Sequence, residues 1–367
     1  MRLVQKAGQR SCLLCKKLLK GSFMIRIDGD YGEGGGQIVR TALALSTITG
    51  KPFKITNIRK GRKVAGLKAQ HLHCIRVLKE LCDAKTNEIN VGSEYLEYTP
   101  AKIKGRTILV DIGTAGSITL LLQAVLLPCL FSKEKVRLKI KGGTDVKWSM
   151  PIDYFCNVLL PYFKKYADIE CLLEKRGYYP KGGGKIDMKI ISKGSEVPVN
   201  QFERGKLIAI KGISNASKHL SKAEVAERQA RAARIMLSSL NVSIRIETHY
   251  AEALSAGSGI CLWALFESED FPVLIGADSL GERGKKSELV GQEASEKLIK
   301  EINSGACVDQ WAADNLIPLI GLFGGRIKTS EITGHTRANI YVTEKFLDCK
   351  FIIEEDKKII SLERHNA

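Results

Sequence analysis

The chain has 367 residues, 44% of them hydrophobic, so it can bury a substantial core and exceeds the length of one ordinary domain. Lysine and arginine number 57 against 40 aspartates and glutamates, which gives a formal net charge of +17. This charge favours a polyanion or a phosphate-rich ligand over an acidic protein partner, but it does not indicate recognition of a particular nucleotide sequence.

Residues 1–23 are basic but lack the continuous apolar stretch of a signal peptide, so we interpret them as an N-terminal extension of a cytoplasmic protein. The first clear strand pattern begins at Met24. The longest apolar run starts at Ile118, falls short of a membrane span and contains Gln123 and Pro128. It therefore predicts a buried helix, and we expect no membrane association.

Most of the 10 cysteines lie inside apolar patterns, as reduced thiols do when they act as small hydrophobic side chains. Cys12 and Cys15 form a C-x-x-C motif, but no second pair at zinc-ligand spacing accompanies them. We therefore expect neither disulfides nor a metal or redox centre at this motif.

Strand and helix patterns then alternate along the chain, separated by glycine clusters. The first unit is predicted as strand, helix, strand and helix at residues 24–29, 37–50, 53–58 and 66–82. The second has strands at 107–113 and 136–143, and helices from Gly116 and at 151–166. A third begins at 169–191, is interrupted, and resumes near 310–325. We expect an α/β fold of repeated β-α-β-α units with further strands.

The interruption coincides with a change in composition between residues 203 and 303. This block has its own alternation of strands and helices, at 206–214, 222–240, 242–250, 259–268 and 287–302. It predicts a smaller α/β domain at 203–303 inserted into a larger domain that is split into residues 24–202 and 304–367.

The stretch DGDYGEGGGQIVR places glycines 34–36 directly before a predicted helix. Main-chain N–H groups and the helix dipole at such a turn suit a phosphate, although glycines can equally serve tight packing of a strand on a helix. Glu33 could hold a divalent ion or a ribose hydroxyl, and the guanidinium of Arg40 beside an apolar face indicates an anion. Neither a dinucleotide fingerprint nor a P-loop is present, since GERGKKS at 281–287 is only a near match.

A second basic stretch, RKGRKVAGLKAQHLH, leads into the helix predicted at 66–82. It is either a solvated run of charge or a phosphate-binding loop. Arg59 and Arg62 supply the charge, and Gln70 and His71 follow in the first helical turns.

Three further side chains are candidates for ligand binding. Gln123 is a polar group in an apolar helix, where it either satisfies a core backbone group or binds a ligand. Trp311 and Asp314 share a helix face, where an indole could stack a base unless it belongs to the core. His335 precedes the alternating run Ile340–Thr343, which predicts a strand with the imidazole at its mouth.

The stretch RGYYPKGGGKI, residues 176–186, fits the signature Arg/His-Gly-x-x-Pro-x-Gly-Gly-Gly-x-aliphatic, and here the chain resembles the RNA 3′-terminal phosphate cyclase family. The resemblance extends over residues 24–360 and includes DGxxGEGGGQIxR, GLxxQH, GSxTLLLQ, GGTD and the closing HTRAN. It implies a large domain of repeated units like the C-terminal domain of a translation initiation factor, with a thioredoxin-like insert.

The resemblance also implies a reaction. His335 would attack the α-phosphorus of ATP, and the adenylyl group would pass to an RNA 3′-phosphate, which the 2′-hydroxyl then closes to a 2′,3′-cyclic phosphate. Mg²⁺ or Mn²⁺ would assist, with Glu33 as a ligand. ATP would be bound by Glu33, Gln123, Pro151, Tyr154, Trp311, Ala312, Ala313, Asp314 and Asn315. The RNA end or the triphosphate would be bound by Arg40, Arg59, Arg62, Gln70 and His71.

Two other interpretations compete with this one. A cyclase-like ribosome-assembly protein would share the fold but bind without catalysis, and a distant transferase would act on small phosphorylated metabolites. The presence of His335, together with Glu33, Arg40 and Trp311, favours the enzyme. The physiological RNA, the metal and the oligomeric state stay open from the sequence, with a homo-oligomer as one option.

Overall fold

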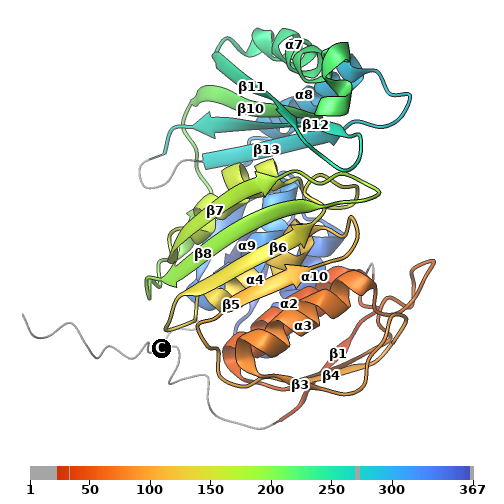
Figure 1. The fold of residues 1–367 in the computed structure, drawn as a ribbon. Coiled ribbons are helices and arrows are strands. Elements are labelled where there is room, and N and C mark those ends of the chain that lie inside the picture. The colour runs from red at the N-terminus through yellow and green to blue at the C-terminus, as the bar shows by residue number, and fades with distance from the viewer. Residues whose placement is uncertain (1–22, 33, 269–272, 364–367) are drawn as a thin grey trace, which may run out of the picture.

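The computed structural model describes residues 23–32, 34–268 and 273–363, and its elements form a mixed α/β fold (Figure 1). Four four-stranded sheets contain the strands β1 (Ile25–Asp28), β2 (Phe53–Thr56), β3 (Lys85–Thr86), β4 (Leu96–Thr99), β5 (Thr107–Asp111), β6 (Val136–Gly142), β7 (Ala167–Lys175), β8 (Gly184–Ser192), β9 (Val199–Gln201), β10 (Leu207–Ser217), β11 (Ser243–Ala251), β12 (Ser258–Phe266), β13 (Val273–Leu280), β14 (Gly325–Lys328), β15 (Phe351–Glu354) and β16 (Ile359–Leu362).

The helices are mostly two to four turns long. They are α2 (Gly36–Thr49), α3 (Ala69–Cys82), α4 (Ile118–Cys129), α5 (Ile152–Tyr154), α6 (Leu160–Phe163), α7 (Val225–Leu237), α8 (Ser287–Asn303), α9 (Gln310–Phe323) and α10 (Gly334–Phe346), with a π-turn η1 (Phe155–Leu159) and short 3₁₀ turns η2 (Lys218–Ala223) and η3 (Ser238–Leu240). Among the described residues, none of these helices combines the length and the apolar character that a membrane span needs.

Three of the sheets share one strand order. They are β1-β2-β4-β3, β5-β6-β8-β7 and β9-β14-β16-β15, so each runs first, second, fourth and third along the chain. In each, the first two strands are parallel and the other pairs are antiparallel. Because β8 pairs with β6, the strands β7 and β8 complete the second sheet. Our expectation that residues 169–191 begin a third unit is therefore wrong.

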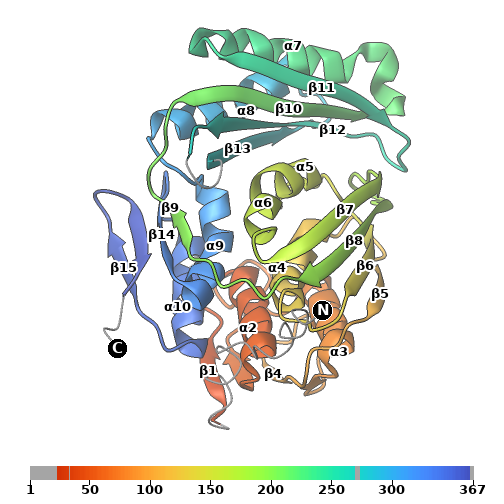
Figure 2. The same ribbon diagram turned by 90° about the vertical axis from the view of Figure 1, so that its left-hand side faces the viewer.

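The helices of these three sheets lie toward the middle of the molecule, with sheets on either side (Figure 2). Helix α2 packs on α10 and α4, and α9 packs on α10. One large core runs through them, and it includes fully buried Ile38, Leu43, Leu121 and Leu316. The long apolar run from Ile118 is thus a core helix, as its sequence predicts.

The fourth sheet, β11-β10-β12-β13, lies at one end of the molecule, with α7 and α8 covering its far face (Figures 1 and 2). We call this sheet with its two helices the outer layer. It has a core of its own, drawn from residues between Ile210 and Cys307. The strand β13 was not predicted, because its neighbours 269–272 and its glycine break the apolar pattern.

A buried polar network joins the outer layer to the second sheet. Arg176 donates to both carboxylate oxygens of Asp153, at 2.9 and 2.8 Å, and to those of Asp145, each at 3.2 Å. Asn215 on β10 donates to the same carboxylates and accepts a 2.7 Å hydrogen bond from the hydroxyl of Tyr178. The signature stretch RGYYPKGGG is therefore a structural junction, and its glycines let β8 and the loop after β7 approach closely.

The segment after His335 is helical, so the strand predicted at Ile340–Thr343 is wrong. Thr333 caps the helix, since its hydroxyl accepts the main-chain N–H of Thr336 at 3.0 Å. Buried residues lie on several sides of α10, which packs between α2 and α9. These helix contacts outweigh the strand preference of the β-branched side chains in the run.

The eight described cysteines are free thiols, and Cys12 and Cys15 lie outside the described residues.

Candidate active site

The main cavity has a volume of about 780 Å³ and lies where the three sheet-and-helix layers meet the outer layer. The first turns of five helices, α2, α3, α4, α9 and α10, contribute to its wall. Each helix start presents main-chain N–H groups and the positive end of a helix dipole. Ser117, Asp309 and Thr333 already cap α4, α9 and α10, whereas α2 begins without a side-chain cap, so the start of α2 is the one suited to an anion. The residues that line it are Gly35, Gly36, Gln37, Arg40, Arg59, Arg62, Lys68, Gln70, His71, Leu120, Gln123, Trp148, Ser149, Met150, Tyr154, Asp278, Lys297, Trp311, Asp314, Asn315 and His335.

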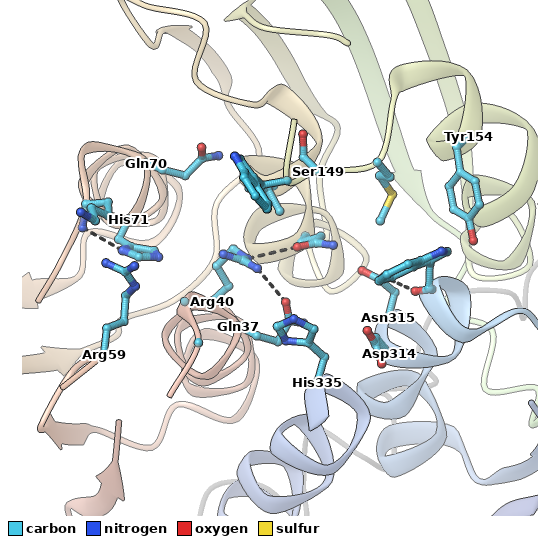
Figure 3. Close-up of a pocket in the computed structure, with 18 of the residues that line it drawn as sticks. Gln37, Arg40, Arg59, Gln70, His71, Ser149, Tyr154, Asp314, Asn315 and His335 are labelled. Atoms are coloured by element: carbon cyan, nitrogen blue, oxygen red, sulfur yellow. Dashed lines mark hydrogen bonds between the residues drawn. The ribbon is translucent and has the colours of Figure 1, made fainter. Parts of the chain in front are cut away.

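The predicted site residues gather in two groups with His335 between them. In Figure 3, Arg59, Gln70 and His71 lie on one side of the cavity, and Tyr154 and Asn315 lie on the other.

Glycines at the start of α2 keep the centre of this cavity open. A Cβ atom at Gly36 would lie 2.2 Å from Nε2 of His71 and 3.2 Å from Nη1 of Arg40. At Gly35 it would lie 3.4 Å from Cε1 of His335. These glycines therefore face the site, and tight packing between a strand and a helix does not account for them.

Arg40 is a buried cation at the floor of the cavity. Its Nε donates to Oε1 of Gln123 at 3.1 Å and its Nη2 donates to Oε1 of Gln37 at 2.7 Å. Both partners are uncharged, and burial lowers the pKa of Arg40 from 12.5 to about 10, which still leaves it protonated at neutral pH. A buried guanidinium with these uncharged partners is suited to an incoming anion.

His71 is a neutral hydrogen-bond donor at the same end. Its Nδ1 accepts the main-chain N–H of Lys68 at 2.9 Å, so the ring proton is on Nε2, the atom that faces Gly36. Burial, followed by the charges of Arg40, Arg59 and Lys68, lowers the pKa of His71 from 6.5 to about 3. The ring therefore stays uncharged and can donate to an anion oxygen at neutral pH.

Two other residues of the basic stretch, Arg59 and Gln70, bond main-chain groups and so fix the shape of this part of the chain. Arg59 donates from Nη1 to the carbonyl oxygens of Val64 and Gly66, at 2.9 and 3.2 Å. Both ends of the Gln70 amide bond the main chain of Ser117, the residue that caps α4. Gln70 thus ties the start of α3 to the start of α4, a role that the sequence did not reveal.

The start of α9 forms the opposite wall. Trp311 is 46% exposed, so the alternative that it is a core residue is wrong. Asp309 caps this helix by accepting the main-chain N–H groups of Trp311 and Ala312, and it also accepts the hydroxyl of Tyr154 at 2.5 Å. Asp314, one turn on from Trp311, accepts the hydroxyls of Thr333 and Thr336 at 2.8 and 2.5 Å.

Three residues predicted to bind the nucleotide do not line this cavity. Ala312 and Ala313 are fully buried in the core, and Pro151 is the buried residue that precedes α5. These three residues are buried and do not face the cavity.

The described residues do not by themselves fit a protein-held metal ion. Within them, no three His, Cys, Asp or Glu side chains lie close enough together to hold one. One carboxylate oxygen of Asp314, Oδ1, already accepts two threonine hydroxyls. Glu33, the predicted ligand, lies outside the described residues.

Several lining residues were not found from the sequence. Asp278 on β13 and Lys297 on α8 come from the outer layer, and Trp148 comes from the loop after β6. Burial raises the pKa of Asp278 to about 6. The sequence gives no sign that the outer layer would meet this cavity, because only long-range packing brings the two together.

Comparison with known proteins identifies the class of enzyme. The model of the family described as RNA 3′-terminal phosphate cyclase matches residues 31–353. A protein of Pyrococcus abyssi named RNA 3′-terminal phosphate cyclase is 44% identical over 332 residues, which are 90% of this chain and 95% of the relative. One of Saccharolobus solfataricus with the same name is 47% identical over 333 residues, 90% of this chain and 96% of the relative. The chain therefore belongs to the RNA 3′-terminal phosphate cyclase family, which is a family of enzymes.

Proposed function

We propose that this protein converts the 3′-terminal phosphate of RNA to a 2′,3′-cyclic phosphate at the expense of ATP. The observation that carries the proposal is the placement of His335 at the start of α10, in a cavity where the buried Arg40 and the uncapped start of α2 attract phosphate groups. The relatives named above support the substrate class.

In the first step, a ring nitrogen of His335 attacks the α-phosphorus of ATP, forming a P–N bond as the bond to pyrophosphate breaks. An oxygen of the RNA 3′-phosphate then attacks the same phosphorus, which frees His335 and gives RNA-(3′)pp(5′)A. Finally the 2′-hydroxyl attacks the 3′-phosphorus, loses its proton, and expels AMP. Negative charge grows on phosphate oxygens in each step, where Arg40, the neutral donor His71 and the helix N–H groups stabilise it.

Trp311 and Asp314 support a place for the adenosine, because a half-exposed indole offers a stacking face and a carboxylate lies one turn away on the same wall. Asn315 and Tyr154 line the same side, and Gln123 orients Arg40. Arg59, Arg62 and Gln70 belong to the opposite side, which we assign to the RNA end or the triphosphate. Mg²⁺ or Mn²⁺ would accompany ATP through its phosphates, with Glu33 as the candidate protein ligand.

We also propose that residues 24–202 and 304–367 form one split domain of three repeated units and that 203–303 form an inserted domain. The strand order common to three sheets and the separate core of the outer layer support this organisation. A cytoplasmic location remains our prediction from the sequence, which leaves a homo-oligomer as one option.

The test is self-adenylylation. The purified protein is incubated with α-labelled ATP and Mg²⁺ or Mn²⁺ without RNA, and we expect label on the denatured protein that is acid-labile and alkali-stable, as a phosphoramidate is. Label that survives acid but not alkali, or no label with an active RNA-cyclising protein, would contradict the histidine intermediate.

A further inference from the structure

Trp148 lines the cavity, and the stability of the fold does not explain why a tryptophan occupies this position. The residue lines the cavity, yet its side chain and main chain together are 93% exposed. Its main chain has φ +69°, in the left-handed region that bulky residues rarely adopt. An indole in water adds nothing to the core, and the backbone conformation disfavours it, so its presence here indicates a ligand.

The loop of Trp148 is tied to a basic segment of the outer layer. Lys147 forms a 2.9 Å ion pair with Glu282, in the segment 281–286 between β13 and α8. Arg283 and Lys286 in this segment are exposed, whereas Lys285 is bonded to Glu293. The Lys147–Glu282 ion pair therefore joins the loop that carries the exposed indole to the segment that carries the two exposed cations.

This combination suits a single-stranded nucleic acid, because such strands are bound by stacking of bases on aromatic side chains and by cations along the phosphates. We propose that Trp148 stacks a nucleobase of the RNA and that Arg283 and Lys286 bind phosphates farther upstream. The inference rests on the proposed function, which brings the RNA 3′ end to His335. Trp148, Arg283 and Lys286 are called the strand track below.

The adenine of ATP is the competing ligand for the indole. Trp311 already offers a half-exposed face beside Asp314 and Asn315, on the wall that we assign to adenosine. The almost complete exposure of Trp148 makes it accessible from outside the cavity, which suits a polymer that must enter and leave across the rim. The geometry thus favours the RNA strand.

Equilibrium binding without ATP tests the stacking. The probe is a fluorescently labelled decaribonucleotide with a 3′-phosphate, followed by anisotropy at fixed salt. We expect Trp148→Ala to weaken binding about tenfold, as loss of a stacked base does, and Trp148→Phe to stay within about twofold because it keeps an aromatic face. Tyr95→Ala, an exposed aromatic that does not line the cavity, is the matched control and should bind as the wild type does.

A scan of single abasic nucleotides near the 3′ end locates the stacked base. At that position the abasic RNA should bind the wild type about tenfold more weakly, and it should cost Trp148→Ala nothing further, since the partner is already gone. Equal losses in both proteins at every position would overturn the assignment.

The cations are tested by salt dependence. Replacing both Arg283 and Lys286 by glutamine should reduce the slope of log affinity against log salt by about 1.4, since each single-strand phosphate contact contributes about 0.7. An unchanged slope would remove these residues from the strand track.

Failure of this inference is separable from failure of the proposed function. If Trp148→Ala binds RNA as the wild type does but needs more ATP for self-adenylylation, the indole stacks on the adenine of ATP. The strand track is then overturned. If the wild type shows the stacking and salt effects but never labels His335, the strand track stands and the proposed reaction fails.

Discussion

Arg40 and His71 show how single residues prepare the cavity for phosphate. Arg40 keeps its charge next to the uncharged amides of Gln37 and Gln123, while burial keeps His71 neutral. One is a cation and the other an uncharged donor, and the missing side chain of Gly36 lets both come close to the start of α2. An anion can thus be bound by both without a second cation having to be buried.

For His335, substitution by alanine separates the steps of the proposed reaction. The variant should lose both self-adenylylation and cyclisation, because the proposed reaction uses the ring nitrogen of His335 as the attacking atom. When it is given RNA that already carries the 3′-adenylyl anhydride, it should still close the ring, since that step uses the 2′-hydroxyl. Chromatography of the RNA product measures this, and a folded His335→Ala protein that still takes up label would refute the mechanism.

For His71, the depressed pKa predicts acid sensitivity. The unfolded chain takes up a proton near pH 6.5 and the folded one only near pH 3, so this residue stabilises the fold above pH 6.5 and loses that contribution as the pH falls toward 3. His71→Asn keeps an acceptor for the N–H of Lys68 but cannot titrate. Thermal unfolding between pH 7 and 4 should show a shallower decline for this variant, and parallel curves would contradict the assignment.

At the scale of elements, one buried carboxylate connects three parts of the site. Asp309 caps α9, accepts the hydroxyl of Tyr154, and accepts the main-chain N–H of Gly276 on β13 at 2.9 Å. The wall with Trp311 is therefore fixed both to α5 and to the outer layer.

Replacement of Asp309 by alanine should destabilise the protein by about 3–7 kcal/mol, because a helix cap is worth about 1 kcal/mol and each of the two buried donors left without a partner, the Tyr154 hydroxyl and the Gly276 N–H, costs about 1–3 kcal/mol. Asp309→Asn retains one oxygen for the cap but turns an amide N–H₂ toward Gly276. Its stability should therefore lie between that of the wild type and that of Asp309→Ala. Urea unfolding gives these values, and a loss below about 0.5 kcal/mol for alanine would show that water replaces the lost acceptor.

The elements also show what a sequence can and cannot predict. Apolar periodicity predicted α2, α4 and the strands β1, β2, β5 and β6, because local pattern and burial agree there. It failed for α10, where packing between α2 and α9 overrides a β-branched run. The basic and glycine-rich stretches indicated one side of the cavity, but Asp278 and Lys297 reach it through contacts distant in sequence, which no local pattern encodes.

On the scale of the whole molecule, two apolar cores are joined by the polar network of Arg176, Asp145, Asp153 and Asn215. The charged groups in this network are almost completely buried. Their pairing ties the outer layer, and with it the far wall of the cavity, to the second sheet.

Arg176→Ala should therefore cost about 3–5 kcal/mol of stability, since it leaves two buried carboxylates without their cation. Arg228→Ala is the control: it removes an equally direct pair with Glu288 that is accessible to solvent, and it should cost far less stability than Arg176→Ala. Calorimetry should also show the melting of the Arg176 variant split into two transitions, one for each core. Similar losses for the two variants would mean that the network is not what couples the layers.

The uncapped start of α2 at the cavity has a practical consequence for assays of this protein in common buffers. Part of the attraction for phosphate belongs to the peptide groups, which no side-chain substitution removes and no change of pH neutralises. Sulfate, inorganic phosphate and similar oxyanions should therefore compete with substrate in every arginine variant as well as in the wild type. Assays in chloride or acetate buffers will measure the contribution of each arginine, whereas assays in phosphate buffer will understate it.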